Sequence, residues 1–308
     1  GEPDMKIIRG MELHNESREE KLPDFAPDFP YIASRVELDY FRESSAPWHW
    51  HRAVELFYIE SGELKYRTPN AVEVFQAGSG GLINSNVLHM TEFQRYGGRN
   101  IQLIHLFDPS LIAGPHDGLI DRKYVVPLLT SRLEMIVLHP EEPEQADILR
   151  LIRQAFELTE EDFGYELLLR EALARIWLKL LHLSPSALQK QPRSSDRSTE
   201  QIKRMLTYIH EHFSEKISVR DLAASAFLSE RECYRVFQTC LHMTPVEYLR
   251  SFRLQQACRM LAEGKEPVTA VGYACGLGSP SYFGKCFRTH TGCTPLEYRR
   301  KWQDPDKM

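Results

Sequence analysis

The 308-residue sequence predicts a multidomain α+β protein, with an N-terminal antiparallel β-barrel, a helical segment and then an all-α domain. Three observations predict it. Apolar and polar residues alternate between 32 and 107, a stretch rich in Ser, Pro and charge covers 184–198, and a helical unit occurs twice after it. We expect the barrel and an N-terminal arm over 1–110, the helical segment over 111–183, a linker over 184–198 and the all-α domain over 199–308.

The barrel prediction depends on short β-rich runs at 54–59, 63–67, 71–75 and 100–107, which Gly residues or a Pro-Asn pair separate. Several short strands at this spacing are typical of an antiparallel barrel or jelly roll. With 42% hydrophobic residues, the chain can build several cores, which excludes a wholly disordered or collagen-like protein.

One group of residues in the predicted barrel could bind a metal. His49, His51 and Glu55 are separated by even steps, so on a continuous strand they share a face, and His89 follows on a later strand. Three imidazoles and a carboxylate suit a divalent transition metal, and a metal-free polar pocket is the alternative. The predicted walls of that pocket suit a sugar or another small polar ligand; they are Arg35, Trp48, Trp50, Tyr66 and His105.

The segment after the barrel is helical by its periodicity. Its last helix, from Phe163 to Leu183, is apolar over most of its circumference. Such a helix packs on its own domain and also on a partner, so we expect a homodimer, with a wholly intramolecular core as the alternative.

The all-α domain contains an internal repeat. A shift of fifty residues places Ser229, Thr244, Pro245 and Glu247, among other identities, on Ser279, Thr294, Pro295 and Glu297. Each copy predicts two short helices joined by a tight turn, over 219–240 and over 268–290, which is a helix-turn-helix candidate. Capping-box spacings open helices at Ser198, Ser218 and Ser229.

A long helix over 245–263 separates the two copies and is roughly 28 Å long, near the ~34 Å between successive major-groove faces of B-DNA. The second helix of each copy has an outward polar face. Arg and Gln can read guanine and adenine edges, so double-stranded DNA is the predicted partner. The outward residues are Arg231, Tyr234, Arg235 and Gln238 in the first copy, and Ser281, Gly284, Lys285 and Arg288 in the second.

Residues 200–301 strongly resemble the AraC/XylS family of transcription regulators, most densely over 270–300. The resemblance implies a seven-helix DNA-binding domain and adds Glu230 and Pro280 to the recognition residues. His242 departs from the family pattern, which commonly has Gly there. Because Ser281 and Gly284 are short, we expect the first unit to make most base contacts and the second to grip the DNA backbone.

The histidine group resembles the first cupin motif in the spacing His49-x-His51-x3-Glu55-x6-Gly62. Glu43 replaces the leading Gly of that first motif. A weaker second motif runs from Gly78 through His89 to Phe93, in which Asn84, Asn86 and Phe93 replace the usual Pro, Gly and Asn. Sensor domains of AraC-type regulators resemble cupins in this way, and many keep the histidines without a known metal. The resemblance also suggests that residues 25–34 form an arm over the barrel mouth.

Charge and cysteine usage agree with an intracellular DNA-binding protein. Residues 1–183 contain 19 Lys and Arg against 30 Asp and Glu, whereas residues 200–308 contain 16 against 12, so a polyanion would meet the C-terminal domain. All six cysteines lie in that domain and have no Cys-x-x-Cys pair, which favours buried reduced thiols over disulfides, zinc or redox sensing. We expect a cytoplasmic protein, since no leader and no apolar run of ~18–20 residues occurs.

The sequence therefore predicts a dimeric transcription regulator that responds to a small polar effector, with RNA polymerase as a further candidate partner. The alternatives are a metal- or redox-responsive regulator and a cupin enzyme fused to a DNA-binding domain. No nucleophile–base pair, phosphate loop or dinucleotide fingerprint occurs, so we predict no enzymatic activity and no cofactor besides the candidate metal.

Overall fold

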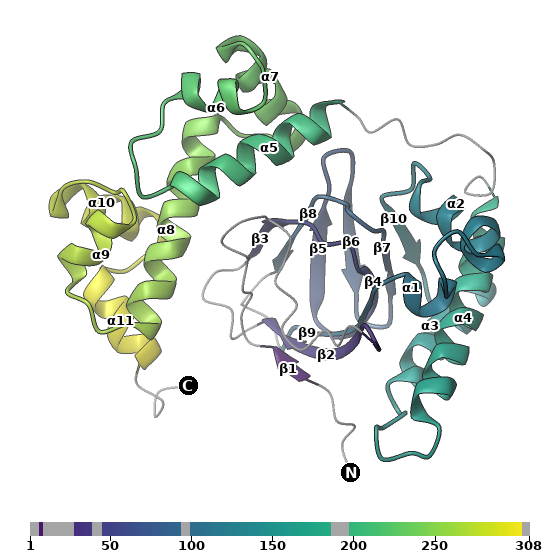
Figure 1. Cartoon of the computed structure of the whole chain (residues 1–308). Helices are drawn as coiled ribbons and strands as arrows, with labels where there is room; N and C mark the ends of the chain where they lie inside the picture. The colour runs from purple at the N-terminus through teal and green to yellow at the C-terminus, as the bar shows by residue number, and fades with distance from the viewer. Residues whose placement is uncertain (1–5, 9–27, 39–44, 94–98, 186–196, 304–308) are drawn as a thin grey trace. The chain divides into compact units, whose positions relative to one another are not determined.

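The computed structural model describes residues 6–8, 28–38, 45–93, 99–185 and 197–303. The chain divides into two compact units, of which the first ends at Asp196 and the second begins at Arg197. This division falls in the predicted linker, and residues 186–196 of the linker lie outside the described residues. We call the first part the β unit and the second the helical unit (Figure 1).

The strands of the β unit form two sheets that face each other. Neighbouring strands are antiparallel except β1 and β2, which confirms the predicted strand direction, and the two sheets correspond to the jelly roll, the second of the two predicted arrangements. The six-stranded sheet has the order β1 (Lys6–Ile8), β2 (Tyr31–Glu37), β9 (Ile101–Phe107), β4 (Val54–Ser61), β7 (Gly80–Ile83) and β10 (Met135–Leu138). The four-stranded sheet has the order β3 (Ser45–His49), β8 (His89–Phe93), β5 (Glu63–Arg67) and β6 (Val72–Gln76).

An aromatic core fills the space between the two sheets. The Phe57 ring stacks on Tyr66 at 4.9 Å between centroids and meets the edge of Phe75 at the same distance. On β4, Phe57 and Ile59 point into this space, while Leu56 points to the opposite face of the sheet. The alternation follows from the strand period of two, and because both faces are covered the run VELFYI is apolar almost throughout.

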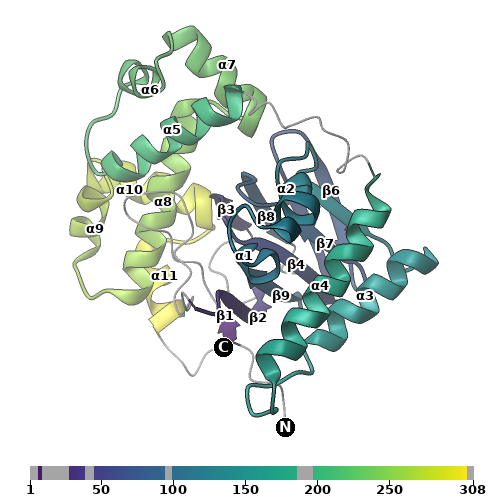
Figure 2. The same cartoon turned by 45° about the vertical axis from the view of Figure 1, so that its right-hand side comes forward.

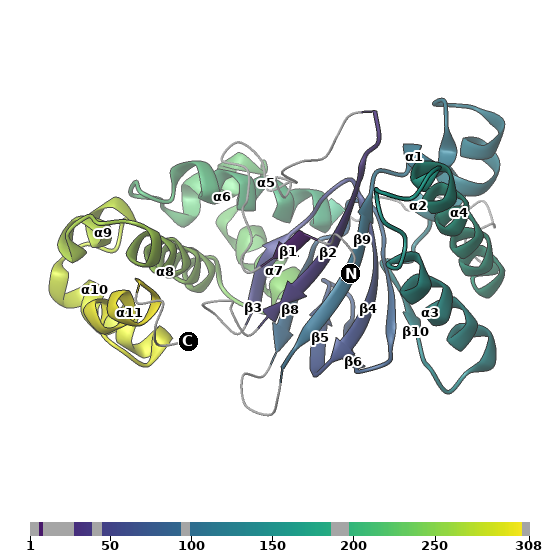
Figure 3. The same ribbon diagram turned by 90° about the horizontal axis from the view of Figure 1, so that it is seen from below.

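Two helices, α3 (Pro143–Ala155) and α4 (Tyr165–Leu183), cover the outer face of the six-stranded sheet, opposite the four-stranded one (Figure 3). In Figure 2 they lie side by side in front of β4 and β9. Leu169, Leu173 and Trp177 of α4 are buried in the same core as Leu56 and Phe107 of the sheet. This core therefore makes the two helices part of the β unit.

The segment 111–183 is not purely helical, which corrects the prediction. After α1 (Ser110–Ala113), a π-helical turn η2 (Asp121–Val125) and α2 (Val126–Leu129), strand β10 returns to the sheet and pairs with β7. The side-chain amide of Asn84 donates to the carbonyls of Leu128 and Leu133 and so holds this connection to the sheet. No local sequence signal predicts such a return, because it depends on pairing with a distant strand.

The helical unit has seven helices within residues 197–303, as the family resemblance implies. Ser218 and Ser229 form capping boxes with Asp221 and Glu232, as predicted, whereas the first helix already begins at Arg197, one residue before the predicted cap Ser198. The helices are α5 (Arg197–His212), α6 (Val219–Ser225), α7 (Glu230–Leu241), α8 (Pro245–Glu263), α9 (Val268–Ala274), α10 (Pro280–Thr291) and α11 (Pro295–Gln303).

The six cysteines are free thiols in the structure. Four of them are buried, as predicted, and Cys286 and Cys293 are half-buried. Burial raises the pKa of Cys233 to about 11 and that of Cys275 to about 12, which disfavours the reactive thiolate at both positions. Among the described helices, none is long and apolar enough to cross a membrane.

Candidate functional sites

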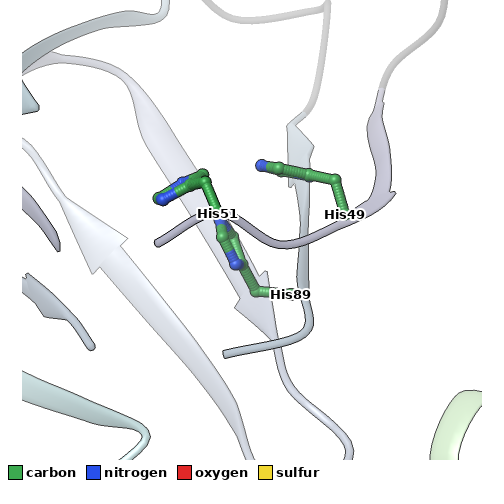
Figure 4. A group of neighbouring side chains, drawn as sticks. All are labelled: His49, His51 and His89. Atoms are coloured by element: carbon green, nitrogen blue, oxygen red, sulfur yellow. The ribbon is translucent and has the colours of Figure 1, made fainter. Parts of the chain in front are cut away.

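The predicted histidine group lies where the chain passes from one sheet to the other. Strand β3 ends at His49, β4 begins only at Val54, and His51 lies between them, so the expectation of one continuous strand is wrong. The side chains meet nevertheless. Ring nitrogens of His49, His51 and His89 all lie within 4.8 Å of one another, and Figure 4 shows the three rings grouped together. We call these three residues and Glu55 the histidine cluster.

Backbone carbonyls orient all three imidazoles. The Nδ1 atoms of His49, His51 and His89 lie 2.7, 2.7 and 2.8 Å from the carbonyl oxygens of residues 47, 53 and 87, respectively. A carbonyl oxygen only accepts, so each Nδ1 carries the hydrogen and donates it. In a neutral ring the lone pair is then on Nε2, and burial together with the neighbouring imidazoles holds the pKa of His49 well below its usual range.

Glu55 completes the cluster from β4. Its Oε1 accepts a hydrogen bond of 2.5 Å from the Tyr66 hydroxyl, and its Oε2 lies 3.6 Å from His51 Nε2 and 3.7 Å from His89 Nε2. Burial raises the pKa of Glu55, but the two imidazoles outweigh burial and keep it below the usual range, so the carboxylate is ionised. The buried cluster therefore groups imidazole ring nitrogens around the negative charge of Glu55.

Buried acceptors need a donor or a cation. His89 Nε2 has no hydrogen-bond partner among the described residues, although its side chain is 1% exposed. Three imidazole nitrogens and a carboxylate are the donor set that transition metals accept, and the carbonyls on Nδ1 are typical outer-shell partners of metal-bound histidines. The three imidazoles therefore fit a metal ion, which His49, His51 and His89 would hold with the Glu55 carboxylate beside two of them.

Of the five predicted pocket walls, Tyr66 contacts the cluster directly through Glu55. Trp48 is buried, and its indole nitrogen has no hydrogen-bond partner among the described residues, while Trp50 is half-buried. Sequence reasoning missed Gln102, whose side-chain amide donates to Glu55 at 3.3 Å and also contacts the Tyr66 hydroxyl. The available signal was an amide side chain inside the apolar run that follows Asn100.

The structure places His105 away from the cluster, which corrects its prediction as a pocket wall. Glu55 pairs with Leu106 on β9, so His105, one position away, points to the opposite face of the sheet. There its Nε2 donates to the carbonyl of Ile152 at 2.9 Å, and its ring stacks on Phe156 at 3.5 Å. Burial lowers the pKa of His105 to about 4.

Arg35 is also separated from the cluster. Arg35 pairs with Leu103 on β9. Leu103 is two residues from His105, so the two side chains point to the same face of the sheet. Arg35 therefore also points to that face, away from the space between the sheets. Its guanidinium forms an ion pair with Glu60 at 2.5 Å and lies 3.7 Å from Glu37. These partners stabilise the outer surface of the sheet and leave Arg35 outside the pocket.

In the first helix-turn-helix motif, α7 separates an inner and an outer face as predicted. Cys233, Val236, Phe237 and Cys240 are buried. The five predicted recognition residues, Glu230, Arg231, Tyr234, Arg235 and Gln238, are exposed.

In the second motif, α10 buries Phe283 and Phe287 and exposes Pro280, Ser281, Lys285 and Arg288. Gly284 is half-buried, and a Cβ at this position would meet no atom within 4 Å. The prediction omitted Tyr282, an exposed aromatic side chain on the same helix.

The family departure at residue 242 has a structural explanation. His242 ends α7 in the left-handed conformation with φ +56°, and Gly292 ends α10 in the same way with φ +80°. A glycine adopts this conformation without strain, which is the reason to expect one there, whereas a histidine adopts it less often. The turn after α7 therefore keeps the shape of its repeat despite the substitution.

Comparison with known proteins agrees with both units. The family described as AraC-like ligand binding domain matches residues 32–177, and the family described as Helix-turn-helix domain matches residues 222–301. The chain belongs to the AraC family. This AraC-family protein is a DNA-binding transcription regulator with a ligand-binding domain. The first match crosses the predicted boundary at 110 and includes most of α4, as the shared core also indicates.

The regulator is 28% identical over 277 residues to the uncharacterized HTH-type transcriptional regulator YdeC of Bacillus subtilis, covering 89% of this chain and 92% of that protein. It is 29% identical over 121 residues to the HTH-type transcriptional activator RhaS of Klebsiella pneumoniae, covering 39% of this chain and 42% of the activator. Among solved structures, ToxT of Vibrio cholerae is 13% identical, with a TM-score of 0.46, covering 89% of this chain and 98% of ToxT.

Proposed function

We propose that this regulator reads double-stranded DNA mainly through α7 and grips the DNA backbone with α10. The exposed Arg231, Arg235 and Gln238 carry this proposal, because Arg and Gln can make bidentate contacts with guanine and adenine. On α10 the exposed Lys285 and Arg288 provide charge for phosphates, whereas Gly284 reaches no base edge. The two helices therefore contribute differently to affinity and to specificity.

Arg231→Ala and Arg235→Ala are each expected to weaken binding to an operator selected from a random DNA pool, by ~1–3 kcal/mol for a lost bidentate base contact. Lys285→Ala should weaken binding to all sequences alike and reduce the slope of log affinity against log salt by about 1. Fluorescence anisotropy across a salt series measures both effects. Arg150→Ala, which removes an exposed charge from the β unit, is the control. Parent-like operator binding by both arginine variants would contradict the role of α7.

We propose that a small polar effector binds at the histidine cluster and controls DNA binding. The observation that carries this is the polar lining of the cluster: the ionised Glu55 carboxylate accepts hydrogen bonds, and the three imidazoles offer ring nitrogens beside it. Sugar hydroxyls donate such bonds, and the indole rings of Trp48 and Trp50 offer faces for a sugar ring. The test is whether a sugar that stabilises the purified protein also changes its operator affinity.

A second candidate function is response to a metal ion, favoured by the three ring nitrogens within 4.8 Å of one another. A metal ion would supply positive charge to the buried acceptors, and its binding would compete with protonation of the imidazoles. Tyr66 and Gln102 would act as outer-shell residues, because both contact the Oε1 side of Glu55 and leave Oε2 toward the imidazoles.

We propose that the regulator forms a homodimer through the outer face of α4. Leu167, Leu168 and Leu178 are exposed on this helix by 73%, 43% and 48%, while the opposite side of α4 is buried on the sheet. The same face carries the exposed ion pair of Glu171 and Arg175, and its three leucines gain stability when a second copy covers them.

Leu168→Glu and Leu178→Glu are expected to give monomers that keep the fold, because a buried unpaired carboxylate at the interface is costly while exposed carboxylates in the monomer are not. Sedimentation velocity at micromolar concentration measures the association, and circular dichroism checks the fold. Leu296→Glu, at a position of α11 with 48% exposure, is the matched control and should stay dimeric. A monomeric parent protein at this concentration would contradict the proposal.

A further inference from the structure

Within the helical unit, Arg253 of the long helix α8 binds the segment that follows α5. Arg253 of α8 donates from Nε to the carbonyl of Phe213 at 2.7 Å and from Nη2 to the carbonyl of Glu215 at 2.6 Å. Both carbonyls follow the end of α5, which packs against α6 and α7. The planar guanidinium thus holds two backbone groups at once, and a lysine lacks this geometry.

The turn of the second motif lies against the same side chain. A Cβ at Gly276 would be 3.0 Å from Arg253 Nε and 2.7 Å from the Phe213 carbonyl oxygen. The Phe213 ring also packs on the core of the second motif and meets the edge of Phe252 at 5.4 Å. Phe213, Arg253 and Gly276 therefore form a joint that contacts both motifs, in addition to α8 itself.

Comparison of the two copies shows what the joint requires. Phe227 is the counterpart of Gly276: both follow the short first helix of their motif, with φ values of +58° and +68°. In each copy the next residue donates its amide five residues back, from Leu228 to Ala223 and from Leu277 to Gly272. Yet Phe227 is 84% exposed, so the first turn has room for a large side chain. The close approach of Arg253 and Phe213 removes that room only at residue 276.

We propose that the joint of Phe213, Arg253 and Gly276 fixes the separation and angle of α7 and α10, so that the regulator accepts only one spacing between its two half-sites. This inference rests on the proposed reading of DNA by these two helices. Helix α8 packs on α7 of the first motif and on α9 and α10 of the second, and so provides one connection between the motifs. A second connection beside it makes the pair rigid, and a rigid pair does not lose affinity to ordering when it binds.

The test uses the selected operator and derivatives in which one or two base pairs are inserted or deleted between the half-sites. Each base pair moves one half-site by roughly 3.4 Å and rotates it by about a tenth of a turn. The parent protein should lose affinity steeply with every change. Arg253→Met keeps the aliphatic stem and removes both hydrogen bonds. We expect it to bind the original operator about tenfold more weakly and to discriminate much less between spacings.

Arg299→Met is the matched control. Arg299 of α11 also donates to two backbone carbonyls, those of Leu261 and Glu266, but lies outside the joint. Its affinity should fall with each inserted or deleted base pair as steeply as that of the parent. Gly276→Ala places a methyl group in the joint. It should weaken binding to the operator with the original spacing more than binding to the operators with altered spacing. If Arg253→Met does not fold, as judged by circular dichroism, Arg253→Lys serves in its place.

An unchanged, steep profile in the folded Arg253 variant would overturn the proposal, and so would equal flattening in Arg253→Met and Arg299→Met. DNA with a single half-site separates this failure from failure of the proposed function. If the joint alone is misassigned, Arg231→Ala still weakens binding to the half-site that the parent recognises. If that substitution has no effect on half-site binding, the assignment of α7 is wrong as well.

Discussion

Replacing His89 with alanine is expected to remove tight binding of a transition metal ion by the purified regulator. The substitution deletes one of the three clustered imidazoles and its lone pair. The loss should exceed the 10–100-fold that removal of an outer-shell partner typically costs. Tyr66→Phe, which deletes the hydroxyl that contacts Glu55 and Gln102 but no ring nitrogen of the cluster, should fall within that smaller range.

Competition titration with zinc and a chromogenic chelator measures these affinities, and elemental analysis of protein purified without chelator gives the stoichiometry. His139→Ala is the control, because this exposed histidine lies on the connection after β10. If the parent protein and the His89 variant bind zinc equally weakly, the cluster does not hold a metal, and the sugar-like effector becomes the preferred ligand.

The same cluster variants test that effector. Glu55→Ala and His51→Ala should weaken effector binding, followed by the fluorescence of the tryptophans near the cluster, in the presence of chelator. Unchanged effector affinity in both variants would mean that the sensing site lies elsewhere in the β unit. Binding that disappears with chelator would instead favour the metal-dependent alternative.

Acidification is expected to destabilise the β unit through His105. Its pKa is about 4 in the folded protein, because of burial, against about 6.5 in an unfolded chain. Below pH 6.5 the unfolded state therefore binds a proton at this histidine, which the folded state does not bind until the pH is near 4. The free energy of unfolding therefore decreases as the pH is lowered. At pH 4 the loss from this residue should reach about 3 kcal/mol, from a shift of about 2.5 pH units at 1.36 kcal/mol each.

Urea unfolding of the parent and of His105→Gln between pH 7 and pH 4 measures this contribution. Glutamine can replace the bonds to the Ile152 carbonyl and the Tyr31 hydroxyl but takes up no proton in this range. The variant should be less stable than the parent at pH 7 and less sensitive to acid. All other residues are the same in both proteins, so the difference isolates His105. Equal acid sensitivity of the two proteins would contradict the prediction.

The helices that carry the proposed DNA contacts could be predicted closely, because their signals are local. Helix α8 has the predicted bounds 245–263, set by the Thr244 capping box and by Gly264. Turns of one helix are neighbours in sequence, so apolar periodicity shows directly which face is buried. The exposed faces of α7 and α10 therefore agree with the prediction, apart from the omitted Tyr282 and the half-buried Gly284.

The histidine cluster was predicted from the right residues and for a wrong reason. Even spacing on one strand does not bring His49, His51 and Glu55 together, because β3 and β4 belong to different sheets. They meet because the chain crosses between the sheets at His51, while His89 pairs with His49 across β3 and β8. A spacing motif can identify such a site, but it does not contain the path of the chain between its residues.

The sequence by itself determined the order of the two units, the repeated helix-turn-helix motif and the residues on its exposed helix faces. Only the tertiary structure decided that Arg35 and His105 point away from the cluster, that Gln102 points toward Glu55, and that Gly276 lies against Arg253. The physical reason is the range of the interactions. Helix faces follow from contacts three or four residues apart, whereas a sheet face follows from the pairing register between distant strands, and a shift of one residue reverses it.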